Sequence, residues 1–117
     1  MDISIIVPLY NEAESLPKLY EWIVRLMKEH GYTYEIPSVN DGSTDESWQV
    51  IETLAEKSHS KGNLEGLGNV HGISFRRNYG KSAALYCGFQ AAQGEVVITM
   101  DADLQDSPEE IPELYRM

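Results

Sequence analysis

A short apolar run that ends in carboxylates constrains this chain more than any other stretch. The run over 96–99 is mostly β-branched, which is typical of a buried strand in a parallel sheet. Asp101 and Asp103 follow directly, with Gln105 behind them. Ligands of open α/β sheets bind just beyond the carboxyl ends of the strands, and carboxylate and amide oxygens are hard ligands that suit Mg²⁺ or Mn²⁺. The stretch therefore predicts a divalent metal site, although a polar loop that closes a strand would have the same composition.

The size and charge of the chain limit its architecture and its partners. Its 117 residues are enough for a single domain with one hydrophobic core. The net charge of −10 argues against a nucleic-acid partner. Cys87 is the only cysteine, which excludes an intramolecular disulfide and fits a reducing compartment. Since no apolar run is long enough to span a bilayer and no signal peptide is apparent, we expect a cytoplasmic protein.

Apolar periodicity divides the chain into alternating strands and helices. Strands are expected over 3–9, 33–40, 70–75 and 96–100, and helices over about 13–30, 44–57, 81–92 and from Ser107 onward. Pro37 lies inside the second expected strand and favours an edge position or a bulge there. The glycine-rich stretch 58–69 is expected to be a loop. The order β-α-β-α-β-α-β-α predicts an α/β fold with a mostly parallel, doubly wound sheet.

The helices have expected ends and faces. Ser43 or Thr44 is expected to cap the second helix, Gly31 to end the first and Gly94 to end the third. One side of the third helix is rich in small residues, which predicts close packing on the sheet: Ala83, Ala84, Gly88 and Ala91.

Polar side chains follow each of the four expected strands, in the segments 10–12, 41–43, 76–81 and 101–106. Because the carboxyl ends of parallel strands meet at one edge of a sheet, these segments are expected to converge. The third segment holds the only dense basic cluster, and we expect at least one of Arg76 and Arg77 to contact phosphate. Carboxylates, basic residues and a divalent ion at one edge suit a nucleoside diphosphate, whose oxygens the ion bridges.

Three classes of phosphate-handling protein compete for this pattern. A P-loop NTPase is rejected, because the required glycine is replaced by Phe75 and the Gly-Lys-Ser sequence at 80–82 does not follow the first strand. An aspartyl phosphotransferase with Asp101 as nucleophile is a minor alternative, since Gln105 stands where a small hydroxyl residue is expected. The third class is a nucleotide-sugar-dependent glycosyltransferase.

Four motifs favour the third class. They are Ile-Ile-Val-Pro-Leu-Tyr-Asn-Glu at 5–12, Asn-Asp-Gly-Ser-Thr-Asp at 40–45, Arg-Asn-Tyr-Gly-Lys at 77–81 and Met-Asp-Ala-Asp-Leu-Gln-Asp at 100–106. Together they resemble glycosyltransferase family 2, and most closely the dolichyl- or undecaprenyl-phosphate sugar transferases of the GT-A fold. Each motif alone is unspecific, but four in the right order over nearly the whole chain are specific.

The resemblance implies a role for each motif. Asp41 would accept a hydrogen bond from the base of the nucleotide, and the segment 78–81 would close on the nucleotide. The residues that would bind the nucleotide-sugar are Pro8, Tyr10, Glu12, Asp41, Asn78, Lys81 and Asp101.

The resemblance also implies the metal site and the reaction. Asp103 and Gln105 would bind Mg²⁺ or Mn²⁺, and Asp101 would lie near the ribose or the metal. The ion would stabilise the departing nucleoside diphosphate of a UDP- or GDP-sugar. The family inverts configuration by direct displacement, here onto a polyprenyl phosphate or a glycan. A lipid phosphate is already anionic and needs little help from a general base.

Members of the family are usually much longer than this chain. Acceptor-site residues, further strands and any transmembrane helices are expected beyond Met117, in a full-length enzyme at the cytoplasmic face of a membrane. The chain is therefore expected to be a truncated donor-binding half that is inactive alone, and its exposed surfaces favour a homodimer. The competing hypothesis is a non-catalytic or engineered fold fragment without turnover, to which the departures from the family at Pro37, Ser38 and 58–69 would also fit.

Overall fold

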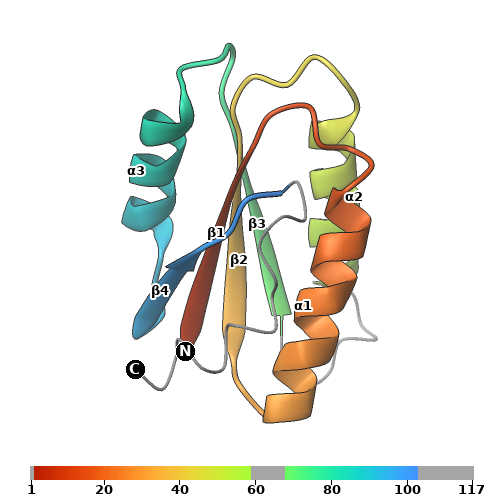
Figure 1. The fold of residues 1–117 in the computed structure, drawn as a ribbon, viewed down its shortest axis with the longest axis vertical. Helices are drawn as coiled ribbons and strands as arrows, with labels where there is room; N and C mark the ends of the chain where they lie inside the picture. The colour runs from red at the N-terminus through yellow and green to blue at the C-terminus, as the bar shows by residue number, and fades with distance from the viewer. Residues whose placement is uncertain (1, 59–67, 103–117) are drawn as a thin grey trace.

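The computed structural model describes residues 2–58 and 68–102 of the chain (Figure 1). Its elements are β1 (Ile3–Leu9), α1 (Leu16–His30), β2 (Tyr34–Asn40), α2 (Ser47–Ser58), β3 (Gly68–Ser74), α3 (Lys81–Ala91) and β4 (Val96–Thr99). This order confirms the predicted alternation, and the helix expected from Ser107 lies outside the described residues. Within 2–58 and 68–102, no helix is long and apolar enough to cross a membrane.

The strands form one parallel sheet in the order β3-β2-β1-β4. The chain moves outward from β1 to β2 and β3, then returns to the other side of β1 as β4. Helices α1 and α2 cover one face and α3 covers the other (Figure 1). This is the predicted doubly wound arrangement, and the strand order reverses between β1 and β4, which is where such folds bind ligands.

The prediction of an edge position or a bulge at Pro37 is wrong. The strand β2 lies between β1 and β3 and is buried throughout. The register is the same on both sides of the proline, since Ser4 pairs with Glu35 and Val7 with Ser38, so no residue is inserted. Proline removes a single N–H from a single ladder, and the remaining pairs on both sides keep the strand in place.

Ser38 also interrupts the apolar pattern of β2, and its hydroxyl has buried partners. Its Oγ shares a hydrogen bond with the hydroxyl of Tyr20 on α1 and donates to the carbonyl of Ile36. Burial raises the pKa of Tyr20, so this hydroxyl stays protonated and available for the bond. A serine is therefore tolerated in the middle of the sheet because its hydrogen-bonding groups are satisfied.

The close packing predicted for α3 is confirmed. Ala84 and Gly88 are buried, and a Cβ atom at Gly88 would lie 2.4 Å from Cγ2 of Ile6 on β1. The helix ends at Ala91, so the prediction that Gly94 ends it is wrong. A Cβ atom at Gly94 would lie 2.6 Å from the backbone nitrogen of Ser4, so Gly94 instead lets the turn before β4 lie against β1.

The ends of α1 follow the prediction more closely than those of α2. Helix α1 starts at Leu16, later than expected, and stops before Gly31 as predicted. Helix α2 is capped by neither Ser43 nor Thr44: the carboxylate of Asp45 accepts the backbone N–H of Ser47 at 2.9 Å. The two hydroxyl residues are instead engaged with the neighbouring loop, as described below.

Candidate functional site

A pocket of about 290 Å³ opens at the carboxyl ends of β1 and β4, where the strand order reverses. The loops that leave β1, β2 and β3 gather at this end of the sheet, at the top of Figure 1. The lining residues are Pro8, Leu9, Tyr10, Glu12, Asp41, Lys81, Ala84, Asp101 and Ala102. All residues predicted to bind the nucleotide-sugar are therefore at this pocket except Asn78.

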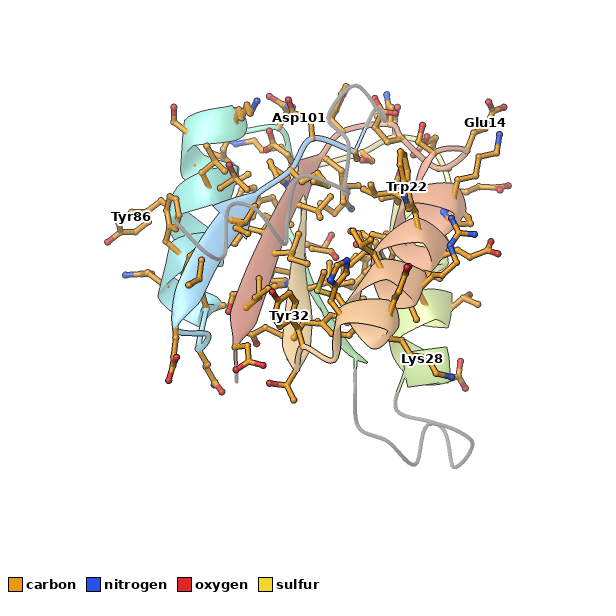
Figure 2. The ribbon with its side chains drawn as sticks, turned by 60° about the horizontal axis from the view of Figure 1, so that its bottom comes forward. Glu14, Trp22, Lys28, Tyr32, Tyr86 and Asp101 are labelled. Carbon is orange, nitrogen blue, oxygen red and sulfur yellow. The ribbon has the colours of Figure 1, made fainter. Side chains whose placement is uncertain are left out.

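An ion pair joins α3 to the segment after β4 at this pocket. Nζ of Lys81, the first residue of α3, lies 2.8 Å from Oδ1 of Asp101. Both side chains remain substantially exposed, at 61% and 42%. Asp101 lies among the loops at the carboxyl end of the sheet in Figure 2. The Lys81 ammonium and the Asp101 carboxylate are thus both accessible to a ligand in the pocket.

Asp41 holds two loops together. Its buried carboxylate accepts the backbone N–H of Tyr79 at 2.8 Å and that of Gly80 at 3.1 Å. The side-chain amide of Asn78 donates to the same carboxylate and to the backbone carbonyl of Asp41, both at 3.2 Å. Asn78 and Asp41 therefore contact one another, and Asn78 positions the loop before Lys81 without lining the pocket.

Gly42 permits the close approach of these two loops. A Cβ atom at Gly42 would lie 2.3 Å from the backbone carbonyl carbon of Arg77, a distance that no side chain could occupy. Any larger residue would push the β3–α3 loop away from Asp41 and with it the start of α3.

The basic cluster lies mainly in solvent. Arg76 and Arg77 are exposed, and neither is among the residues that line the pocket. The guanidinium of Arg77 lies 4.8 Å from the ring centroid of Tyr79, which packs edge-on against Phe75. Of the basic residues in the segment 76–81, Lys81 is the one that the structure brings to the pocket, and the phosphate contact expected of Arg76 or Arg77 stays a prediction.

Hydrogen bonds from three consecutive residues tie the β1–α1 loop to the β2–α2 loop. The backbone N–H groups of Asn11 and Glu12 donate to Oγ of Ser43 and Ser47 at 2.9 Å each, and that of Ala13 donates to Asp45 at 3.4 Å. Sequence reasoning missed these contacts. The available signal was an excess of Ser, Thr and Asp over 43–47, more side-chain acceptors than a single helix cap requires.

Comparison with known proteins establishes the family. Residues 4–117 match the model of glycosyl transferase family 2. The chain belongs to glycosyl transferase family 2.

Curated relatives within this family share considerable identity. The undecaprenyl-phosphate 4-deoxy-4-formamido-L-arabinose transferase of Pseudomonas fluorescens is 46% identical over 112 residues, which cover 96% of this chain and 30% of that protein. The protein of the same name from Proteus mirabilis is 44% identical, over 96% of this chain and 32% of its own length. This family 2 chain thus spans about a third of the length of these relatives.

Solved structures show that the family 2 domain has the GT-A fold. TarS of S. aureus superposes with a TM-score of 0.72 at 21% identity, over 99% of this chain and 32% of its own. A mannosyltransferase of Pyrobaculum calidifontis, in complex with GDP-Man and Mn²⁺, gives 0.68 at 28% identity, over 86% of this chain and 27% of its own. The predicted fold class and family resemblance are both confirmed.

The metal ligands predicted for the family 2 domain are placed only in part. Asp101 is at the pocket with a partly exposed carboxylate, a hard oxygen donor that fits Mg²⁺ or Mn²⁺. Asp103 and Gln105 lie outside the described residues. Among residues 2–58 and 68–102, no group of three or more His, Cys, Asp or Glu side chains is arranged to hold a metal ion. The part of the predicted site that the structure describes is compatible with a divalent ion.

Proposed function

We propose that this family 2 domain binds a nucleoside-diphosphate sugar together with Mg²⁺ or Mn²⁺. The observation that carries the proposal is the pocket at the strand-order reversal, where Glu12, Lys81 and Asp101 lie together in a chain of this family. Support for the ligand class comes from the mannosyltransferase complex with GDP-Man and Mn²⁺. Whether the base is uracil or guanine is an outcome of the test below.

Each lining residue has a group suited to one part of such a donor. The half-exposed Tyr10 and the ring of Pro8 offer apolar surface to a base, and the Glu12 carboxylate is an acceptor for ribose hydroxyls. Asp41 is the proposed acceptor from the base, in addition to its contacts with the β3–α3 loop. The Lys81 ammonium neutralises charge on the diphosphate, with Asn78 holding the loop that precedes it.

Asp101, Asp103 and Gln105 would hold the divalent ion. A bound ion of this kind supplies electrostatic stabilisation of the leaving nucleoside diphosphate. In the absence of a donor, Lys81 balances the charge of Asp101, and we propose that Lys81 turns toward the phosphates when the ion is bound.

For the longer enzyme we propose transfer with inversion to a polyprenyl phosphate, with a glycan as the other acceptor class. The support is the name of the relatives, which are undecaprenyl-phosphate sugar transferases. We place the reaction at the cytoplasmic face of a membrane, in line with the single cysteine of the chain, which fits a reducing compartment.

Calorimetric titration of UDP and GDP, each with and without Mn²⁺, tests the donor proposal. One nucleotide should bind in a Mn²⁺-dependent manner, and Asp103→Ala should weaken this binding at least about tenfold. Glu52→Gln, which removes an exposed carboxylate on α2, is the matched control and should bind as the unmodified chain does. Failure of a folded sample to bind either nucleotide would favour the non-catalytic fold fragment.

A further inference from the structure

The side chain of Asn11 completes the contact between the first two loops. Its Oδ1 accepts the backbone N–H of Thr44 at 2.8 Å and that of Asp45 at 3.2 Å, with the Thr44 hydroxyl at 3.4 Å. Its own backbone N–H donates to Ser43 on the same loop. Asn11 is therefore bonded to the β2–α2 loop through both its side chain and its backbone.

The backbone of Asn11 has a conformation that most residues avoid. Its φ of 54° is the only positive value at a non-glycine residue in the described chain. Each of the next two loops at this edge also has a left-handed position, and both are glycine: Gly42 with φ 72° and Gly80 with φ 101°. Glycine adopts this conformation with least strain, but it has no side chain to accept the two N–H groups.

Both of the loops that Asn11 joins contribute residues to the lining of the pocket. Tyr10 and Glu12, the immediate neighbours of Asn11, line the pocket from the β1–α1 loop, and Asp41 lines it from the β2–α2 loop. Asn11 itself is not a lining residue. The spacing of Tyr10 and Glu12 from Asp41 thus depends on how the two loops are joined. Asp41 in turn accepts the backbone N–H groups of Tyr79 and Gly80, so the position of the β3–α3 loop depends on the same contact.

We propose that Asn11 is a positioning residue: the acceptor oxygen of its side chain fixes the β1–α1 loop on the β2–α2 loop and so orients Tyr10 and Glu12 toward Asp41. The consequence for donor affinity depends on the function proposed above, whereas the joining of the loops is a property of the free chain. The competing explanation is that Asn11 is only a turn residue that tolerates a left-handed backbone.

Two substitutions separate these explanations. Asn11→Gly keeps or eases the backbone conformation and removes the acceptor oxygen. Asn11→Asp keeps an acceptor oxygen at the same place. Ile36→Val, a core change on β2, is the control for a general loss of stability.

The first measurement is amide hydrogen exchange by NMR without nucleotide. Asn11→Gly should speed exchange at Thr44 and Asp45 at least about tenfold, because those two amides lose the acceptor oxygen of Asn11. Exchange at Glu12 should also speed up, because its bond to Oγ of Ser47 depends on the two loops being held together. Asn11→Asp and Ile36→Val should retain the protection at these amides. Unchanged protection of Thr44 and Asp45 in Asn11→Gly would overturn the proposal, since Asn11 would then be only a turn residue.

The second measurement is calorimetric titration of UDP and GDP with Mn²⁺ into the same variants. Asn11→Gly should weaken binding about tenfold, with Asn11→Asp and Ile36→Val close to the unmodified chain. If the unmodified chain binds and Asn11→Gly binds equally well, the positioning role is overturned while the donor proposal stands. If the unmodified chain binds neither nucleotide, the donor proposal fails, and the exchange data alone decide whether Asn11 joins the loops.

Discussion

The Asp45 carboxylate is one of several side chains at this edge of the sheet that accept hydrogen bonds from backbone N–H groups. Burial disfavours its charged form, but the hydrogen bonds that it accepts from Ser47 and Ala13 outweigh this and lower its pKa below the ordinary value of 3.8. A carboxyl group with a lowered pKa in the folded state stabilises the fold above its unfolded pKa. That stabilisation is lost as the pH falls through the folded value.

We therefore predict that Asp45 contributes to stability at neutral pH and not in strong acid. Asp45→Asn should lower the free energy of unfolding by on the order of 0.5 kcal/mol at pH 7, a small value because the side chain is exposed. The difference from the unmodified chain should shrink as the pH falls below 3.8 and through the folded pKa. Urea unfolding of both proteins at a series of pH values measures this difference in the free energy of unfolding. Glu46→Gln is the control for loss of a neighbouring charge, and an equal effect of both variants at pH 7 would contradict the prediction.

Asp41 permits a prediction that separates its structural contacts from any contact with a nucleotide. Asp41→Asn exchanges one acceptor oxygen for an NH₂ group that would face the N–H donors of the β3–α3 loop. A buried donor left without an acceptor costs about 1–3 kcal/mol, and we expect a loss of this size in urea unfolding without nucleotide. Asp101→Asn, at a partly exposed carboxylate, should change stability by less than about 0.5 kcal/mol. Equal stabilities of the two variants would show that the loop does not need the Asp41 carboxylate.

The limits of sequence reasoning at this scale are physical. Tyr10, Glu12, Lys81 and Asp101 could be placed at one edge because each follows a strand, and strand ends are readable from local periodicity. The bonds of Asn11 could not be read in this way. Its partners lie more than thirty residues away, and no local spacing specifies which loop a turn residue will contact.

At the scale of elements, the order of strands and helices could be predicted from the sequence, but most of the contacts between neighbouring elements and loops could not. The apolar run of β2 was sufficient to predict a strand, but its central position depends on pairing with both neighbours, which outweighs the missing N–H of Pro37. Helix α2 starts later than predicted because Ser43, one of its expected cap residues, instead accepts a hydrogen bond from the backbone of the β1–α1 loop. The one close contact that the sequence predicted was the packing of the small-residue side of α3 on the sheet.

That contact gives a prediction for α3. Gly88→Ala should stabilise an isolated helix by about 1 kcal/mol, because alanine is the better helix former. In this protein the new Cβ would lie 2.4 Å from Cγ2 of the fully buried Ile6, so overpacking should win. We expect a net loss of about 1–3 kcal/mol in the free energy of unfolding. Ser82→Ala, on the exposed side of the same helix, is the control, and a Gly88→Ala variant as stable as that control would contradict the contact.

At the scale of the whole molecule, the sheet topology places the pocket and determines which of the described strands lie at the edges of the sheet. The reversal between β1 and β4 brings Asp101 beside Lys81 although twenty positions separate them in the chain. The same topology leaves β3 and β4 with one neighbour each within the described sheet. An unpaired strand edge is a template for pairing with another chain, and the homodimer expected from the sequence stays a prediction with this physical basis.

The edge at β4 is where we expect two copies to associate. Val97 on this strand is 40% exposed, and Tyr86 on α3 is 63% exposed and points away from the sheet in Figure 2. Size-exclusion chromatography with light scattering should show a dimer whose fraction rises with concentration. Val97→Lys places a charge on the edge and should shift the mass toward one chain, because a lysine there opposes strand pairing. Val24→Lys on α1, where the valine is 43% exposed, is the matched control and should leave the dimer intact. A mass of one chain at every concentration would exclude the dimer, and equal effects of both substitutions would place the interface elsewhere.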